Sequence, residues 1–390
     1  MSRNVTDQNF IPFALPDISN AEIEQVLECL KSGWLTTGPK AAVFETRFAE
    51  VVGARHAIAV NSCTAAMHLG LEAMGIGAGR QVVTSVFTFT ASAEVIRYLN
   101  ADPYFIDIDH DTMNMNPSHL EHALEKSSRV DAVIPVHFAG HACEMADILD
   151  ICSQKSVRVL EDAAHAFPTT YRGHMVGSIG DATAFSFYAT KTLAVGEGGM
   201  LTTDDDALAE RCRIMRLHGI SRDVFNRYQS EQPAWFYEVV APGFKYNLPE
   251  IAAAIGLAQL DRRDELARRR QAIAMRYNEA LGILPLVLPT PRSAGDQHAW
   301  HLYVIRLDPE HAPIGRDDFI AGMSERGIGT SVHFIPLHRQ PYWRDRYELS
   351  PEQFPVAERT FQHCVSLPIY SAMSDDDISR VIDAAIALLG

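Results

Sequence analysis

The sequence predicts an α/β protein with a largely parallel sheet, followed by a smaller α+β domain. Short apolar runs of strand character alternate with helical runs, a pattern typical of a parallel sheet covered by helices on both faces. The chain has 390 residues, enough for one large domain and a second, smaller one. No internal repeat, low-complexity tract or flexible linker interrupts this alternation.

Seven strands are predicted from short apolar runs bounded by polar or turn-forming residues. In chain order they are HAIAVN (56–61), QVVTS (81–85), PYFIDID (103–109), DAVIPV (131–136), VRVLED (157–162), ATAFSF (182–187) and GMLTTD (199–204). Helices are expected after the first two, through TAAMHLGLEAMG (64–75) and ASAEVIRYL (91–99).

The pattern changes after Pro249. One long helix is predicted through EIAAAIGLAQLDRRDELARRRQAIAMRYNEAL, ending near Gly282, before a mixed segment that contains HAWHLYVIRL and GIGTSVHF. We therefore expect a large domain over residues 1–250, including an N-terminal arm. The connecting helix and the small domain then occupy residues 251–390.

Composition narrows the class of protein. The chain carries 34 Lys and Arg against 49 Asp and Glu, a net charge of −15, which argues against binding to nucleic acid or to an anionic membrane. An anionic small substrate stays compatible, because the potential inside a cleft can oppose the overall sign. Six scattered cysteines without a CxxC pair, and the absence of a signal-peptide-like or membrane-spanning run, predict a cytoplasmic protein.

Several polar side chains follow predicted strands, and ligands of open α/β sheets bind at that edge. Ser62, Cys63 and Thr64 follow one strand and open a helix, where backbone N–H groups and the helix dipole favour a phosphate. A simple N-cap by Ser62 or Thr64 is an equally good interpretation.

In LEDAAHA (160–166) a predicted strand ends on two acids. Strand alternation places Glu161 on one face of the sheet and Asp162 on the other. A carboxylate in the position of Asp162 could pair with a protonated ring nitrogen, and the alternative is again an N-cap.

Lys191 directly follows another predicted strand, among the small residues Ala189, Thr190, Thr192 and Ala194. A lysine amine becomes a useful nucleophile when desolvation or a nearby cation lowers its pKa. The alternative is a surface lysine with a snorkelling side chain.

Phe89 lies in VFTFTAS (86–92), after the strand 81–85, and could stack on a heteroaromatic ring or fill the core. Together, an amine, a carboxylate, an aromatic face and an anion site at one sheet edge are the set that pyridoxal phosphate (PLP) requires.

With these motifs in order, the chain resembles the DegT/DnrJ/EryC1/StrS family of sugar aminotransferases, PLP enzymes of fold type I with a mixed, mostly parallel sheet. The motifs are SGWLTTGP (32–39), VNSCTAAMHLGLEAMGIGAG, EDAAHA, GDATAFSFYATKTLAVGEGGML, GFKYNLPEIAAAIGLAQL and VSLPIY (365–370). PGFKYNLPEIAAAI and HAWHLYVIR look most like the branch that aminates C4 of a UDP-linked 4-ketopentose. SVHFIPLHRQPYW (331–343) looks more like the wider hexose-acting family.

The resemblance implies a role for each matching residue. Lys191 would form the Schiff base and transfer protons, Asp162 would pair with the pyridine nitrogen, and His165 would lie near the phenolic oxygen. The other implied cofactor-binding residues are Ser62, Cys63, Thr64, Ala65, Phe89 and Ser186. Asn247 or Lys245 would reach the cofactor phosphate of a neighbouring subunit, so a homodimer with shared active sites is expected. The implied substrate-binding residues are Trp34, Thr36, His301, His333 and His338.

The implied reaction is a ping-pong transfer of an amino group from glutamate to the C4 keto group of a nucleotide-linked keto sugar, with pyridoxamine phosphate as the intermediate form of the cofactor. Arg213, Arg216 and Arg222 are candidates for contacting the diphosphate. No metal is expected, because the spacing of the histidines fits no common ligand motif.

Four other functions are alternatives to this one. They are amination at C3, a PLP-dependent sugar dehydratase, a Schiff-base aldolase and a non-enzymatic regulator. The dehydratase relative has histidine where this chain has Lys191. An aldolase would have no use for Asp162 or the phosphate site, and no DNA-binding helix pair is evident.

Overall fold

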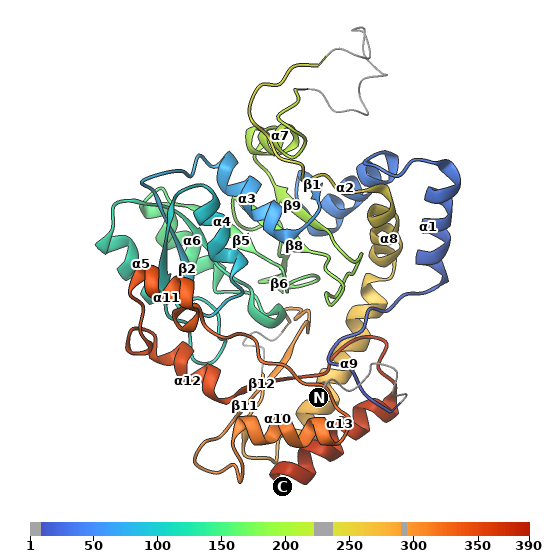
Figure 1. Cartoon of the computed structure of the whole chain (residues 1–390), viewed down its shortest axis with the longest axis vertical. Coiled ribbons are helices and arrows are strands. Elements are labelled where there is room, and N and C mark those ends of the chain that lie inside the picture. The colour runs from blue at the N-terminus through green and yellow to red at the C-terminus, as the bar shows by residue number, and fades with distance from the viewer. Residues whose placement is uncertain (1–8, 222–236, 290–294) are drawn as a thin grey trace.

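The computed structural model describes residues 9–221, 237–289 and 295–390. A seven-stranded sheet and the helices around it form the larger part of the molecule (Figure 1). A three-stranded sheet with α9, α10 and α13 lies below it, and a two-stranded ribbon completes the strands of the described ranges. The predicted α/β class is confirmed.

The large sheet has the strand order β1-β9-β8-β5-β4-β2-β3. Its strands are β1 (His56–Val60), β2 (Gln81–Ser85), β3 (Asp102–Ile106), β4 (Val130–Ile134), β5 (Arg158–Asp162), β8 (Ala182–Ser186) and β9 (Gly199–Thr203). Only β9 runs antiparallel to its neighbours β1 and β8. The carboxyl ends of the other strands therefore meet at one edge, together with the beginning of β9.

Both faces of this sheet are buried, which explains why its strands are apolar runs without alternating polar residues. In β5, Leu160 packs toward α3 with one core cluster, whereas Val159 packs with residues of α5 and α6 in another. Phe185 and Phe187 join Phe44 and Phe48 of α2. The helices of the large part are α1 (Asn20–Ser32), α2 (Pro39–Val52), α3 (Cys63–Ala73), α4 (Ala91–Tyr98), α5 (Pro117–Lys126), α6 (Met145–Gln154), α7 (Asp206–Met215) and α8 (Glu250–Asp261).

The predicted long helix after Pro249 is wrong in one respect. It is divided at Arg262 into α8 and α9 (Arg263–Leu281), and the Arg262 guanidinium pairs there with Asp17 and Glu22. Helix α8 packs on α1 and α2, so it lies with the large sheet. The expected domain boundary between residues 250 and 251 stays a prediction.

The small sheet is antiparallel, with the order β10-β11-β12. Its elements are β10 (Leu286–Val287), β11 (Tyr303–Leu307), β12 (Cys364–Leu367), α10 (Arg316–Glu325), α11 (Pro341–Tyr347), α12 (Pro355–His363) and α13 (Asp375–Leu389). The remaining elements are the ribbon strands β6 (Thr170–Tyr171) and β7 (His174–Met175) and the 3-10 turns η1 (Phe138–Gly140), η3 (Leu337–Arg339) and η4 (Pro351–Gln353).

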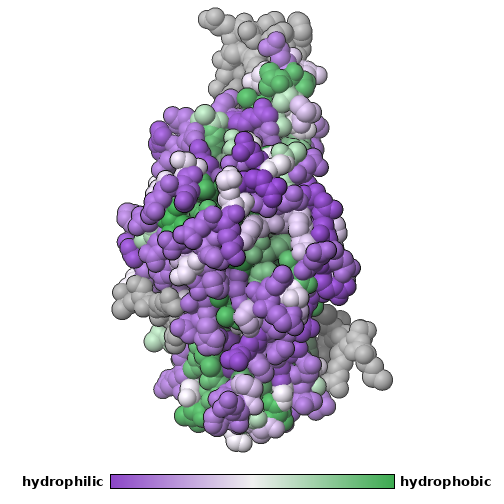
Figure 2. All heavy atoms as spheres, turned by 90° about the vertical axis from the view of Figure 1, so that its left-hand side faces the viewer, coloured by the Kyte–Doolittle hydropathy of each residue, from purple (hydrophilic) through white to green (hydrophobic). Residues whose placement is uncertain are grey.

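One core cluster joins the two sheets. Phe87 and Phe138 from the large part pack in it with Leu302, Val304 and Leu337 from the small part. This contact places the segment before β11 against the carboxyl edge of the large sheet. The face on the left of Figure 1 is mostly hydrophilic (Figure 2). None of the helices in the described ranges is long and apolar enough to cross a membrane.

Candidate active site

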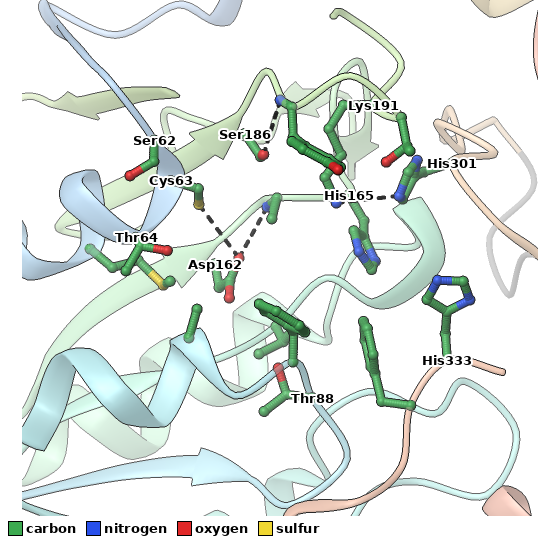
Figure 3. Close-up of a pocket in the computed structure, with 18 of the residues that line it drawn as sticks. Ser62, Cys63, Thr64, Thr88, Asp162, His165, Ser186, Lys191, His301 and His333 are labelled. Carbon is green, nitrogen blue, oxygen red and sulfur yellow. Dashed lines mark hydrogen bonds between the residues drawn. The ribbon is translucent and has the colours of Figure 1, made fainter. Parts of the chain in front are cut away.

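A cavity of about 380 Å³ lies at the carboxyl edge of the large sheet, where the segments before β11 and η3 cover it (Figure 3). Ten residues predicted from the sequence line it: Ser62, Cys63, Thr64, Phe89, Asp162, His165, Ser186, Lys191, His301 and His333. They come from four regions of the large part and two of the small part, so the fold brings together groups that are far apart in the sequence.

Asp162 ends β5 and is buried. Its Oδ2 accepts a hydrogen bond from Ser92 Oγ at 2.7 Å, and its Oδ1 accepts one from the Ala164 N–H at 3.1 Å and contacts the Cys63 thiol at 3.9 Å. Thr88 Oγ1 lies 2.8 Å behind Ser92 Oγ. The carboxylate is thus held as an acceptor facing the cavity. The N-cap interpretation of Asp162 is wrong, because no helix follows it, and the Ala164 contact lies in a turn.

Glu161 lies on the other face of β5, as strand alternation predicted. Its Oε1 accepts from the Gly180 N–H and from Thr183 Oγ1, each at 2.8 Å, and its Oε2 lies 2.9 Å from His137 Nε2. Because His137 Nδ1 accepts from the Cys143 N–H, the imidazole proton is on Nε2 and points at Glu161. Both oxygens of Glu161 therefore have hydrogen-bond partners inside the chain, whereas its neighbour Asp162 faces the cavity.

Lys191 lies in the loop between β8 and β9, and its N–H donates to the Tyr188 carbonyl at 2.9 Å. Its side chain is half-buried and lines the cavity, so the surface-lysine interpretation is wrong. Burial lowers the pKa of the amine to about 8, although Cys63 and Asp162 act in the opposite direction. A substantial fraction of neutral, nucleophilic amine is therefore present just above neutral pH.

Three histidines cover the side of the cavity opposite Asp162. Burial, reinforced by the charge of Lys191, lowers the pKa of His165 and of His301 well below the ordinary value, and it lowers the pKa of His333 to about 4. All three are neutral at physiological pH. His165 Nδ1 accepts from the Ala139 N–H, so its proton is on Nε2. His333 Nδ1 lies 2.9 Å from Ser366 Oγ.

The anion site forms where α3 begins. Ser62 is the N-cap, and its Oγ accepts from the Ala65 N–H at 3.1 Å, so the capping interpretation is confirmed. Ser62, Cys63 and Thr64 still line the cavity at the positive end of the helix. Ala65 is buried outside it. Gly199 makes this packing possible, since a Cβ there would lie 2.4 Å from the Ser62 carbonyl carbon.

Phe89 is 60% exposed and lines the cavity. The core-phenylalanine interpretation is therefore wrong, and one face of its ring is available for stacking. Ser186, at the end of β8, accepts from the Tyr188 N–H through its Oγ and also faces the cavity.

Besides Ala65, five predicted residues lie outside the cavity. Asn247 donates through Nδ2 to Thr37 Oγ1 at 2.7 Å, and Trp34 donates through Nε1 to the Thr37 carbonyl at 3.1 Å. Lys245 and Thr36 are exposed near them. His338 is buried against Phe354 with its Nε2 3.0 Å from Glu358, so the structure does not bring it to the cavity.

The arginine candidates for the diphosphate are wrong where they can be examined. Arg216 is buried and pairs with Glu45, and Arg213 lies beside His56. Neither lines the cavity. Arg222 lies outside the described residues. In the described ranges, no group of three or more His, Cys, Asp or Glu is arranged to hold a metal ion.

Sequence reasoning missed Phe13, Thr88, Tyr188 and Phe334, which line the cavity, and Ser92, which bonds Asp162. Glu197, in the quoted motif GDATAFSFYATKTLAVGEGGML, also lines it. Thr88 and Ser92 lie in the quoted stretch 86–92 at a strand end, a signal that could have identified them. Phe13 and Phe334 approach only through the tertiary fold.

The residues of this cavity fit PLP. It offers a neutralisable amine, a fixed carboxylate, an open aromatic face, a helix N-terminus with hydroxyl groups, and a His165 N–H donor, in a volume suited to a small molecule. The fold and this set define the class as a PLP-dependent aminotransferase.

The comparison with known families identifies the particular group. The model of the DegT/DnrJ/EryC1/StrS aminotransferase family matches residues 16–385. The chain belongs to this family and is a PLP-dependent sugar aminotransferase.

Two further comparisons agree. The chain is 50% identical over 378 residues to the spore coat polysaccharide biosynthesis protein SpsC of Bacillus subtilis, covering 96% of each chain. It superposes with a TM-score of 0.90 and 30% identity on the PMP-form of the putative sugar aminotransferase Spr1654 of Streptococcus pneumoniae, covering 97% of this chain and 98% of that one. A PLP-form of that protein also matches, with a TM-score of 0.89, 29% identity and coverage of 98% and 100%. PLP is the cofactor of this protein.

Proposed function

We propose that the protein transfers an amino group from glutamate to the C4 keto group of a nucleotide-linked keto sugar, a 4-keto-6-deoxyhexose or a 4-ketopentose. The observation that carries the proposal is the Lys191 amine, with its pKa near 8, in one cavity with the fixed carboxylate of Asp162. The family match and the polysaccharide role in the printed name of SpsC support a sugar acceptor. Assignment to the 4-ketopentose branch rests on sequence resemblance alone.

PLP, when bound, supplies an electron sink for the carbanion formed at the amino-bearing carbon. In this proposal Asp162 keeps the ring nitrogen protonated, and Ser92 and Ala164 keep the carboxylate in place. Phe89 covers one ring face. Ser62, Thr64 and Ser186 bind the phosphate, and the His165 Nε2–H donates to the phenolic oxygen.

Lys191 bonds the cofactor and, once released, moves a proton as general base and then as general acid. Its lowered pKa suits both roles, because the amine and the ammonium form are both populated near pH 8. The two half-reactions predict ping-pong kinetics.

A homodimer is part of the proposal. Ile23, Leu27 and Leu30 lie on one face of α1 and are each about half exposed, whereas Glu22 and Cys29 are buried. An amphipathic helix with its apolar stripe outward is unusual for a monomer and suits a face that a second copy covers.

The site also needs a partner. No arginine lines the cavity in the described residues, and its one lysine is Lys191. A substrate diphosphate therefore requires cations from elsewhere, and Lys245, Asn247, Trp34 and Thr36 form an outer patch that a neighbouring subunit's site could use.

All six cysteines are buried and unpaired, which supports the proposed cytoplasmic location.

The test is a two-step assay on the purified chain with PLP. Glutamate alone should convert the PLP-bound form of the enzyme, which absorbs violet light, to the pyridoxamine form. A panel of 4-keto and 3-keto nucleotide sugars should then restore it, with NMR of the product locating the new amine. Borohydride should attach the cofactor to Lys191, identified by peptide mass spectrometry. Restoration by 3-keto sugars alone would favour C3 amination, and loss of a hydroxyl without amination would favour the dehydratase.

A further inference from the structure

His301 lies in a backbone segment that is held in an unfavourable conformation. Trp300, directly before it, has φ of +49°, the left-handed region that bulky residues rarely adopt. Such a conformation persists where surrounding contacts over-determine it, often next to a functional group. The contacts around Trp300 therefore indicate what the fold is holding in place.

Arg270 of α9 is the main contact. Its Nη1 donates to the Trp300 carbonyl at 3.0 Å and to the Ile369 carbonyl at 2.8 Å. Arg270 is buried, its Nε has no partner, and no carboxylate of the described residues forms an ion pair with it. Burial lowers its pKa to about 10. A buried cation without a direct ion pair is costly, although the charge of Asp17 acts against the effect of burial. Here the guanidinium fixes the backbone beside His301.

Further bonds fix the same segment. Trp300 Nε1 donates to Gln271 Oε1 at 2.6 Å, the Ala299 N–H donates to the Gly140 carbonyl, and the Leu302 N–H donates to the Ala139 carbonyl. The segment is thus tied to α9 on one side and to η1 of the large part on the other. The position of His301 is set by both parts of the molecule.

The His301 ring meets the Lys191 side chain, as Figure 3 shows, with Nε2 3.3 Å from Nζ. The ring is 6% exposed, and Nδ1 is buried without a partner among the described residues. Burial and the positive charges of Lys191 and Arg270 keep the imidazole neutral. An ammonium group has only donors, so Nε2 accepts from Lys191 and the imidazole proton is on Nδ1.

We propose that His301 is a positioning residue for Lys191. Whenever the Lys191 amine is not bonded to the cofactor, His301 holds it by a hydrogen bond, and the lone pair of the amine stays free. This inference rests on the proposed role of Lys191. Nε2 accepts a hydrogen bond from the ammonium form and from the neutral amine alike, because both carry N–H donors. The lone pair of the neutral amine then points away from His301 and stays available to take a proton.

The proposal concerns the protonation of Lys191, so the other groups around its amine matter. The titratable side chains that line the same cavity are Cys63, Asp162, His165, Tyr188, Glu197, His301 and His333. Of these, His301 alone has an atom within hydrogen-bond distance of Nζ in the described part of the chain, its Nε2. His333 provides a matched control, since it is a neutral cavity histidine that bonds Ser366 instead.

The test measures the pKa of the Lys191 amine in the full-length chain without cofactor, from the pH dependence of labelling by an amine-reactive reagent at the Lys191 peptide. In His301→Leu the acceptor is lost, the ammonium form is less stable, and the midpoint should fall by about half to one pH unit. Because the wild-type midpoint is near 8, labelling at pH 7 should rise about three- to fivefold. His301→Gln, which can place an acceptor near the same point, should keep the midpoint close to that of the wild type, and His333→Leu should leave it unchanged.

The plateau rate at high pH reports access to the amine, and the midpoint reports its pKa. A merely opened cavity raises the plateau and, by returning water to the amine, raises the midpoint, which is the opposite of the expected fall. An unchanged midpoint in His301→Leu, or an equal fall in His301→Leu and His301→Gln, overturns the proposal. If His301→Leu does not fold, His301→Asn, whose side chain is too short to reach Lys191, replaces it with the same expected fall. The proposed aminotransferase function fails separately, if borohydride does not attach PLP to Lys191.

Discussion

The two walls of the cavity are built differently. On the wall formed by the large sheet, Asp162 and Ser62 have hydrogen-bond partners inside the chain. On the wall formed by the small part, His301 Nδ1 has no partner among the described residues, and Trp300 has a left-handed backbone. A satisfied wall keeps its shape by its own bonds, whereas a strained one keeps it only through the structure around it.

The two walls suit two different tasks in the proposed reaction. A cofactor must be held in one orientation through both half-reactions, which suits fixed acceptors on a rigid sheet edge. A lysine that bonds the cofactor, leaves it and carries a proton needs a partner that accepts it in more than one state. The variants of His301 proposed above test the wall of the small part, and the four predictions below test the groups of the sheet wall.

The largest effect is expected from Lys191→Ala. Loss of the amine removes both the covalent bond to the cofactor and the general base, so amino transfer from glutamate should fall by about a thousandfold or more. The rate of the absorbance change after glutamate is added to the PLP-bound enzyme measures this loss. Lys155→Ala, at an exposed position after α6, is the matched control. A Lys191→Ala enzyme with wild-type rates would remove Lys191 from the mechanism.

Asp162→Asn tests the fixed wall directly. The amide has nearly the same shape but carries no charge to keep the ring nitrogen protonated, so the half-reaction should slow by about a hundred- to a thousandfold. PLP content, read from the absorbance, should stay near the wild-type value. A variant that binds PLP and reacts at the wild-type rate would contradict the proposed pairing.

The adjacent acid should behave in the opposite way. Glu161→Gln replaces one acceptor oxygen by an amide donor among the Gly180, Thr183 and His137 donors, which should lower the free energy of unfolding by about 2–4 kcal/mol. Urea unfolding measures this loss, while the half-reaction rate of the folded fraction should change little. Equal free energies of unfolding for Glu161→Gln and the wild type would show that the Glu161 carboxylate is not needed for stability.

The smallest effect concerns the cost of burying Lys191. Its folded-state pKa of about 8 lies below the ordinary value of 10.5, so the folded chain binds fewer protons than the unfolded chain between these values. Burial of Lys191 therefore costs stability below about pH 8, and the cost disappears as the pH rises toward 10.5.

Lys191→Met should accordingly stabilise the cofactor-free protein by roughly 1–2 kcal/mol at pH 7, after allowance for partial access to water. Melting temperatures from pH 7 to about pH 10 should show the advantage shrinking with pH, whereas Lys155→Met should show no such trend. An advantage that is constant with pH would mean that the amine is not desolvated.

Part of the site could be predicted from the local sequence pattern. Strand alternation placed Glu161 and Asp162 on opposite faces, and the strand before Lys191 placed its amine at the ligand-binding edge. The sequence did not reveal the division of the helix at Arg262, because that break depends on ion pairs with Asp17 and Glu22, far away in the chain. The arginines 213 and 216 failed for the same reason, since their partners come from other elements.

By itself, the sequence determined the α/β class, the order of the strands along the chain, the residues that could serve PLP and, through its motifs, the family. These follow from local periodicity and short spacings. Only the tertiary structure decided which of these groups meet: Ser92 bonds Asp162 across 70 residues, and His301 meets Lys191 across 110. Such contacts are set by how the two sheets pack on each other, and no local pattern in the chain records that packing.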